Sequence, residues 1–249
     1  MRPVAASRIP LALLLGMIAA AANVVGGFAI VRRQWSRAYL KYFIALGAGF
    51  MLATAFLEMI PESLRLTSSV SRVFVLVLAG YLLVHFFEHT VAPHFHFGEE
   101  THHDEVAHAH AGFAALLGLV IHTFFDGVAI ASGVLVSASL GTVIFLAIFL
   151  HKLPEGSTIA SLMLASGKSK RFALLSSAVL GGATLAGVGL MYLLRGSVAE
   201  ALPFSSGVTI YVAASDLMPE VNREPGPVMP VLVFLGVLLM LLLRLLLPF

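Results

Sequence analysis

The sequence predicts an all-α polytopic membrane protein whose eight transmembrane helices form a 3+2+3 inverted-repeat bundle. Three observations lead to this fold class. First, 59% of the 249 residues are hydrophobic and only 11% are charged, whereas a soluble domain carries about 25% charged residues. Second, eight apolar stretches each reach the length of roughly 20 residues that crosses a bilayer as a helix. Third, an internal repeat relates the first three stretches to the last three.

These stretches fill almost the whole chain, so we expect a single transmembrane domain over residues 1–249. The first stretch follows Arg2 and Arg8 as a signal peptide would, but its apolar sequence continues through Val31, which favours an uncleaved helix. In order, the predicted helices lie at residues 9–31, 39–60, 73–93, 111–136, 138–166, 172–194, 201–219 and 228–249.

Positive charges flank the predicted helices unevenly, which predicts their orientation. Cytoplasmic loops are enriched in Lys and Arg, so we expect both termini outside, in a bacterial plasma (inner) membrane. The pI of 9.1 rests on a net charge of only +2; this fits residues beside a lipid bilayer and argues against a nucleic-acid surface. Eight basic residues lie on the predicted inside, namely Arg32, Arg33, Arg37, Lys41, Lys168, Lys170, Arg171 and Arg223, and five lie opposite, namely Arg2, Arg8, Arg65, Arg72 and Arg195.

The connection between the third and fourth helices, residues 94–110, is rich in histidine and acidic residues. On the predicted orientation this loop is cytoplasmic. Alternating imidazole and carboxylate groups favour weak, exchangeable binding of metal ions. A disordered polar connector is the alternative, and we do not expect the loop to be essential. Its histidines are His94, His96, His102, His103, His108 and His110.

A five-residue pattern, acid-x-x-Pro-Glu, occurs near the ends of the second and seventh helices. Because these helices run in opposite directions, the two copies would lie at opposite membrane faces, as in an inverted repeat of a transporter. Their carboxylates could serve as metal stations at the two mouths of a path. Independent helix ends are the alternative, and for Glu62 and Glu220 ordinary interfacial exposure explains the acid equally well. The copies read Glu58-Met-Ile-Pro61-Glu62 and Asp216-Leu-Met-Pro219-Glu220.

The fourth and fifth helices share a second pattern, His-x-x-x-acid-Gly. A spacing of four places each His and its acid on one helix face. Two such faces would gather two imidazoles and two carboxylates, which is a ligand set for a borderline divalent metal. Thiolate ligands and disulfides are excluded because the chain has no cysteine. For one copy alone, the alternative is a buried His–acid pair that only holds two helices together. The copies are His122-Thr-Phe-Phe-Asp126-Gly127 and His151-Lys-Leu-Pro-Glu155-Gly156.

Lys152 directly follows the histidine of the second copy and lies deep within a predicted helix. Snorkelling to the interface is difficult from that depth, so we expect an internal ion pair with Asp126 and Glu155. A cation there would repel a second metal and argues for one metal ion at this level. Gly127 and Gly156 would allow neighbouring helices to approach closely.

Two other classes of function compete with a metal path. An intramembrane zinc hydrolase could use His and Asp ligands with an activated water, but the chain has no His-Glu-x-x-His pattern. A membrane metal sensor would use the histidine-rich loop and would depend little on Asp126 or Glu155. Paired patterns and acids near both mouths favour a path, so we expect no enzymatic activity.

Together these residues resemble the ZIP (Zrt/Irt-like) family of metal transporters, and the resemblance covers nearly the whole chain. The family's fourth-helix pattern, His-Asn-x-x-acid-Gly, matches residues 122–127 except at Thr123, and its fifth-helix pattern matches residues 151–155. The seventh-helix sequence from Asp216 to Glu220 also matches. The resemblance implies uptake of Zn²⁺ into the cytosol, with Cd²⁺, Fe²⁺ and Mn²⁺ as related substrates and no catalytic cofactor. It also implies alternating access and, in many members, a homodimer.

The resemblance assigns His122, Asp126, His151 and Glu155 as the primary metal ligands. Some family members bind a second metal through the Asn after the first His and an acid after the second ligand. Thr123 and Lys152 occupy those positions here. A two-metal centre is therefore not expected, and Lys152 would replace the second cation.

Overall fold

The computed structural model describes residues 8–32, 37–90 and 109–246, and all regular structure within these residues is helical. Each helix falls close to its predicted range. Serine side chains cap the amino ends of two of them, with Ser137 accepting from Leu140 N and Ser169 from Phe172 N. The helices are α2 (Ile9–Val31), α3 (Arg37–Thr54), α4 (Ile60–Leu66), α5 (Val70–Thr90), α6 (Ala109–Val136), α7 (Ala138–Ala165), α8 (Lys170–Leu193), α9 (Val198–Tyr211), α10 (Met218–Arg223) and α11 (Val228–Leu246); π-helical turns η1 (Ala55–Met59) and η4 (Val212–Leu217) and the short η3 (Arg195–Ser197) complete the set.

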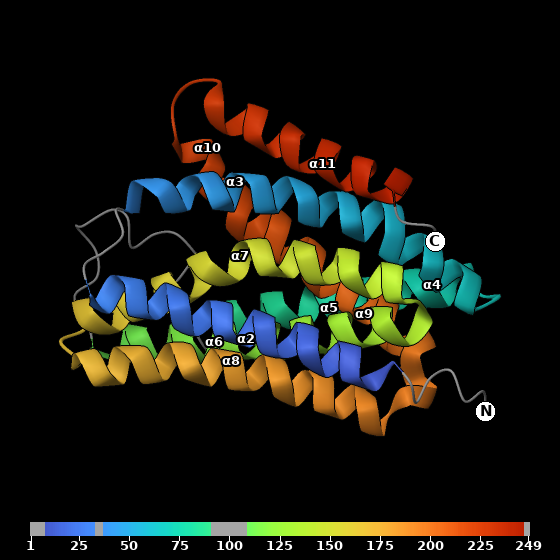
Figure 1. The fold of residues 1–249 in the computed structure, drawn as a ribbon, viewed down its shortest axis with the longest axis horizontal. Helices are drawn as coiled ribbons and strands as arrows, with labels where there is room; N and C mark the ends of the chain where they lie inside the picture. The colour runs from blue at the N-terminus through green and yellow to red at the C-terminus, as the bar shows by residue number, and fades with distance from the viewer. Residues whose placement is uncertain (1–7, 33–36, 91–108, 247–249) are drawn as a thin grey trace.

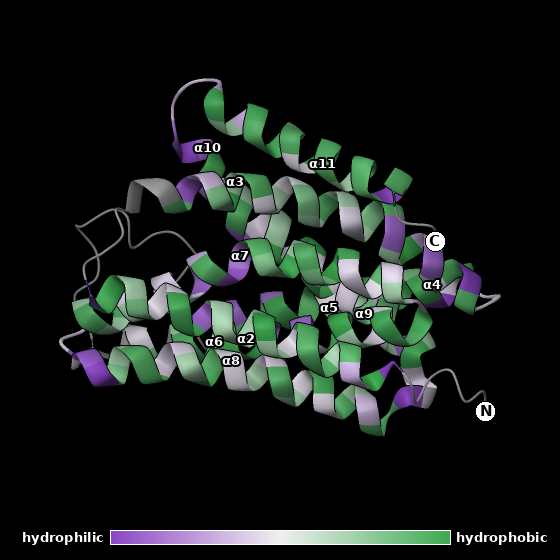
Figure 2. Ribbon diagram, viewed as in Figure 1, coloured by the Kyte–Doolittle hydropathy of each residue, from purple (hydrophilic) through white to green (hydrophobic). Residues whose placement is uncertain are grey.

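Within the described residues, seven helical segments are long and apolar enough to cross a membrane, so the chain is an all-helical polytopic membrane protein. In Figure 2 hydrophobic residues run along the helices, and hydrophilic residues appear at the ends of the bundle, for example on α4 and α10. The one remaining predicted helix, residues 201–219, is also helical, but it is divided among α9, η4 and α10. It is not among the seven, and its crossing of the membrane stays a prediction.

Helix packing follows the predicted two-fold pattern. α2 packs against α7 as α8 packs against α6, and α3 packs against α11 as α9 packs against α5. The contact of α3 with α7 likewise corresponds to that of α9 with α6. The same contacts are therefore found when α2 is exchanged with α8, α3 with α9, and α5 with α11. In this exchange α6 takes the place of α7, and these two helices are labelled in Figure 1.

The two acid-x-x-Pro-Glu copies adopt the same irregular backbone, which supports the internal repeat. Each copy places its first acid in a π-helical turn, η1 or η4, and its proline at the start of the next α-helix. The wider turn is visible in the hydrogen bonds from Ile60 N to Ala55 O and from Met218 N to Ala213 O. π-helical turns occur frequently at functional sites.

Both glycines of the His-x-x-x-acid-Gly patterns lie where neighbouring backbones touch. A Cβ on Gly127 would collide with the carbonyl oxygen of Thr184 on α8, and one on Gly156 would collide with that of Asn23 on α2. Close backbone approach is the usual basis of helix association in membranes. The prediction that these glycines permit close packing is confirmed, and they fix α6 and α7 against α8 and α2.

Candidate metal centre

The centre lies on the hairpin of α6 and α7, which a single non-helical residue, Ser137, connects. His122 lies 15 residues before Ser137 and His151 lies 14 residues after it. At 1.5 Å per residue, both histidines therefore lie roughly 21 to 23 Å from the turn. The short connection thus places the His–acid faces of α6 and α7 at nearly the same distance from the turn.

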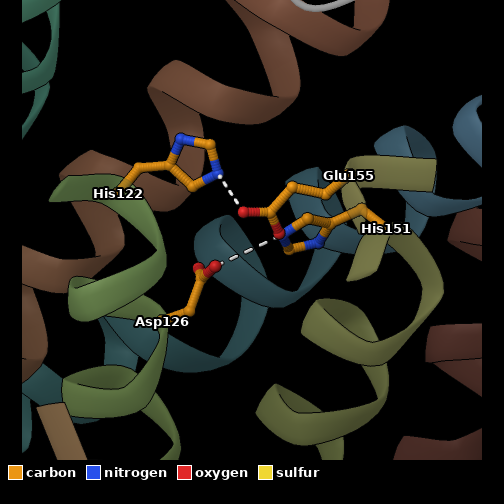
Figure 3. A group of neighbouring side chains, drawn as sticks. All are labelled: His122, Asp126, His151 and Glu155. Carbon is orange, nitrogen blue, oxygen red and sulfur yellow. Dashed lines mark hydrogen bonds and ion pairs between the residues drawn. The ribbon is translucent and has the colours of Figure 1, made fainter. Parts of the chain in front are cut away.

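The four predicted ligands meet in the interior of the bundle (Figure 3). One ligand atom from each lies within 4.8 Å of the others, and all four residues are at most 1% exposed. His122 Nε2 is 3.4 Å from Glu155 Oε1, and His151 Nε2 is 3.3 Å from Asp126 Oδ2. Each close contact thus joins a ligand on α6 to a ligand on α7, and the four converge on one point.

Several atoms of this group have no hydrogen-bond partner. Both ring nitrogens of His122 and the Oδ1 atom of Asp126 are buried and make no hydrogen bond. His151 Nδ1 lies 3.4 Å from the carbonyl oxygen of Ala147. With its proton on Nδ1, His151 would direct the Nε2 lone pair toward Asp126, as a metal ligand requires. Buried polar atoms without partners are costly in a membrane, so this donor set fits a cation.

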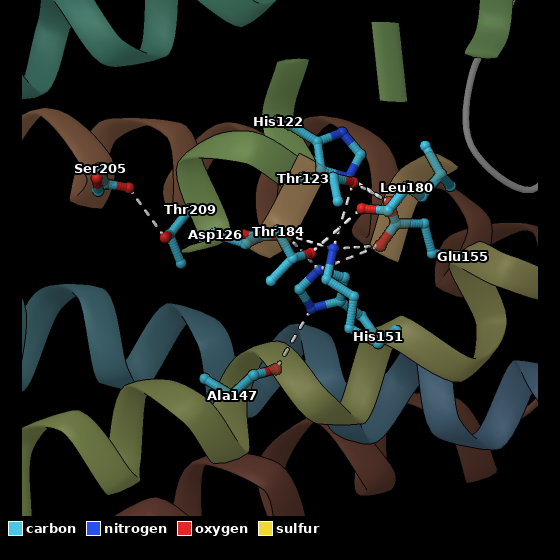
Figure 4. A network of polar contacts seen from close by, with 11 residues as sticks. His122, Thr123, Asp126, Ala147, His151, Glu155, Leu180, Thr184, Ser205 and Thr209 are labelled. Carbon is cyan, nitrogen blue, oxygen red and sulfur yellow. Dashed lines mark hydrogen bonds and ion pairs between the residues drawn. The ribbon is translucent and has the colours of Figure 1, made fainter. Parts of the chain in front are cut away.

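Lys152 forms the predicted internal ion pair. Its Nζ lies 2.7 Å from Asp126 Oδ2 and 2.5 Å from Glu155 Oε2, and the residue is fully buried. Nζ also donates to Thr123 Oγ1 at 3.3 Å, and Thr123 in turn donates to Glu155 Oε1. Figure 4 shows Thr123 beside Glu155 in this network. The two residues that depart from the family pattern therefore contact each other and the carboxylates.

Charge balance explains why an ammonium is found at this depth. Two carboxylates buried without a counter-charge would be strongly destabilising, because desolvation of ions costs several kcal/mol each. Lys152 neutralises one of the two negative charges, because it donates a hydrogen bond to Glu155 and forms an ion pair with Asp126. With neutral imidazoles, the empty site then carries one net negative charge and still attracts a cation.

The first acid-x-x-Pro-Glu copy faces a cavity of about 730 Å³ at the end of the bundle near α4. We name it the α4 cavity. Glu58 is buried there, with Oε1 3.1 Å from Arg244 Nε. Glu62 is partly exposed and pairs with Arg65 at 3.1 Å. The cavity is lined by Leu57, Glu58, Pro61, Glu62, Arg65, Val136, Ser137, Leu140, Arg244, Leu245 and Leu246.

The second copy lies at the opposite end of the bundle, where Glu224, just after α10, pairs with Lys41 near the start of α3. Asp216 is buried beside Glu88 of α5. Two neighbouring carboxyl groups repel each other unless a proton or a cation lies between them. Glu220 is also buried, 3.4 Å from Arg223, so interfacial exposure does not explain it.

Sequence reasoning missed two of these contacts. No sequence pattern assigns a role to Glu88 or to Arg244. Each contact joins helices far apart in the chain, α5 with η4 and α11 with η1, so no local spacing reveals it. The loop histidines His94, His96, His102, His103 and His108 lie outside the described residues, and the side chain of His110 does too.

Comparison with known proteins relates the whole arrangement to one family. A family model described as ZIP Zinc transporter matches residues 7–114 and 98–244. Mouse Zinc transporter SLC39A7 is 30% identical over 139 residues, which is 51% of this chain and 29% of that protein. Zinc transporter ZIP13 of Pongo abelii is 27% identical over 216 residues, 80% of this chain and 63% of that protein.

Zinc transporter zipt-7.1 of Caenorhabditis briggsae is 26% identical over 242 residues, 73% of this chain and 62% of that protein. The matched part of the chain thus spans 29% to 63% of the length of these three relatives. All three are named as zinc transporters. A buried cluster of His, Asp and Glu is the kind of site that such a name requires.

Proposed function

The chain belongs to the ZIP zinc transporter family, whose model matches most of its length, and we propose that it carries Zn²⁺ into the cytosol through the centre on α6 and α7. The observation that carries this proposal is the convergence of His122, Asp126, His151 and Glu155 within a membrane bundle. Ionisable groups are expensive there and by default indicate an ion path. Family membership supports transport over catalysis.

The ligand set suits a transported metal. Imidazole and carboxylate hold Zn²⁺ without the tight binding that thiolates give. Passage requires an affinity high enough for capture and low enough for release. Cd²⁺, Fe²⁺ and Mn²⁺ accept the same ligands, so they are included as related substrates. The metal is the substrate in this proposal, and no catalytic cofactor is assigned.

The path would extend from the centre to both acid-x-x-Pro-Glu copies. We assign Glu58 and Glu62 to the outer mouth and Asp216 and Glu220 to the inner mouth, with Glu88 beside Asp216. Support comes from their positions at opposite ends of the bundle and from the cavity in front of Glu58. The histidine-rich loop, residues 94–110, would bind metal weakly on the cytoplasmic side.

Alternating access is the proposed mechanism. α2, α6, α7 and α8 pack on one another through close glycine contacts and would move as one bundle. α3 with α11 and α5 with α9 would form the surrounding scaffold. We further propose eight crossings, termini outside a plasma membrane and assembly as a homodimer, in keeping with the family resemblance.

Replacing Lys152 by Asp is expected to raise the number of metal ions bound at the centre from one to two. The substitution removes the ammonium that pairs with both acids and adds a carboxylate at the family's second-metal position. Metal analysis of purified protein would count the bound ions, with Lys168→Asp, a change on a loop, as the control. An unchanged count would refute the assignment of Lys152 as a replacement cation.

Uptake of radioactive zinc into proteoliposomes tests the proposed function directly. Saturable uptake by the wild type, lost in His122→Ala/Glu155→Ala, is the expected result, because the double variant removes a ligand from each helix. Zinc binding and helical content of both proteins would be measured in parallel. A folded wild type that binds zinc but does not transport it would contradict the proposal.

A further inference from the structure

Arg244 and Glu58 form an ion pair that is poised for exchange. The atoms Arg244 Nε and Glu58 Oε1 lie 3.1 Å apart, yet Glu58 Oε1 makes no hydrogen bond of good geometry. The Glu58 side chain is only 7% exposed, whereas that of Arg244 is 45% exposed. The acid is therefore held in the wall of the α4 cavity, and the guanidinium approaches it from the exposed side of the pair.

The internal repeat makes this pair unusual. α11 packs against α3, the helix that leads into the turn of Glu58, and α5 correspondingly packs against α9, the helix that leads into the turn of Asp216. α11 supplies Arg244 to Glu58, whereas α5 supplies Glu88 to Asp216. At one end of the bundle the repeat acid faces a cation, and at the other it faces a second acid. The two ends should therefore hold a divalent cation with different strength.

We propose that Arg244 is a tethered competitor of the substrate cation and sets the affinity of the α4 cavity for divalent metal. A guanidinium keeps its charge at any physiological pH, so the competition is permanent. An arriving metal ion gains Glu58 as a ligand only when Arg244 leaves it. Arg244 has open space for this exchange because nearly half of its side chain is exposed and lines the cavity.

The consequence is a low-affinity station at this mouth. Glu62 reinforces this arrangement, because its own partner Arg65 also points a cation into the cavity. A station of low affinity would release the metal onward instead of retaining it, while a pair of acids at the other mouth would bind it more firmly. The inference rests on the proposed function only in naming the cation as the transported substrate.

A fluorophore in the cavity can report on binding without any transport. The chain contains no cysteine, so Val136→Cys introduces a unique thiol at a partly exposed position of the cavity wall. We would label it with a fluorophore and titrate with Co²⁺, whose binding nearby quenches the emission. The measurement is made on the full chain carrying His122→Ala/Glu155→Ala, so binding at the central site does not contribute.

Removal of Arg244 should strengthen binding at this site. Arg244→Gln is expected to lower the Co²⁺ concentration at half-quenching about three- to fivefold, the effect of a partly exposed ion pair. Arg244→Lys should leave it within about twofold of its original value, since a lysine can also pair with Glu58. Adding Glu58→Gln to Arg244→Gln should abolish the gain. Size-exclusion profiles and helical content confirm that each variant is folded, with Arg244→Met as a second neutral variant.

The matched control is Arg65→Gln, which removes the same charge from the same cavity without touching Glu58. It should produce a smaller shift than Arg244→Gln. Equal shifts in the two variants, no shift in Arg244→Gln, or a shift that persists with Glu58→Gln would each overturn the inference. Because no variant here relies on uptake, a failure of zinc transport would leave this result intact.

Discussion

Replacing Asp126 or Glu155 by Ala is expected to abolish saturable zinc uptake while the protein still folds. Each acid would contribute one of the four proposed ligands at the centre. We expect a loss of at least about 100-fold, since even groups that only support a metal ligand contribute about 10- to 100-fold. Folding should persist, because Lys152 still pairs with the carboxylate that remains. That partner is Glu155 at 2.5 Å when Asp126 is replaced, and Asp126 at 2.7 Å when Glu155 is replaced. Uptake into proteoliposomes, normalised to folded protein, measures the loss.

Two further variants separate the loss of a ligand from a loss of packing. Asp126→Asn and Glu155→Gln keep the shape of the side chain and should lose uptake as completely as the Ala variants. Glu200→Gln is the control, because this acid lies at the bundle surface and pairs with Arg72 away from the path. Wild-type rates in both Ala variants would exclude the centre from the transport path.

Substitution of Gly127 or Gly156 by Ala should destabilise the fold by about 1 to 3 kcal/mol each, the usual cost of inserting atoms into a packed interior. The added Cβ would collide with the backbone carbonyl of Thr184 or Asn23. Backbone cannot rotate away as a flexible side chain can, so the two helices must separate. The midpoint of thermal unfolding in detergent should fall in both variants.

Gly182 and Gly189, which lie on α8, provide matched controls. A Cβ on Gly182 or Gly189 would meet no atom within 4 Å. Their replacement by Ala should leave the unfolding midpoint unchanged or raise it slightly, because Ala favours a helix over Gly by about 1 kcal/mol. If all four variants unfolded at the same temperature, close packing at Gly127 and Gly156 would not be what holds α6 and α7 in place.

The sequence was sufficient to predict the helices and the convergence of His122, Asp126, His151 and Glu155 for a local reason. His122 and His151 lie on consecutive helices with one residue between them, so helix periodicity and chain order already determine which faces meet. The internal position of Lys152 could be predicted for the same reason, since it lies one residue from a ligand and far from either helix end.

The contacts at the two mouths could not be predicted in this way. Arg244 meets Glu58 across 186 residues of chain, and Glu88 meets Asp216 across 128. Which residues of α11 and α5 face these acids depends on how the outer helices rotate when they pack. The π-helical turns add to the difficulty, because each wider turn changes the direction of the side chains that follow it.

Lys152 also gives the centre an electrical property. With neutral imidazoles, two carboxylates and one ammonium give the empty centre a net charge of −1. Binding of one Zn²⁺ gives the loaded centre a net charge of +1. If the centre crosses the membrane as proposed, a voltage that is negative inside draws the loaded form inward and returns the empty form outward, by about 2.3 kcal/mol per charge for each 100 mV. The membrane potential would then drive both halves of the transport cycle.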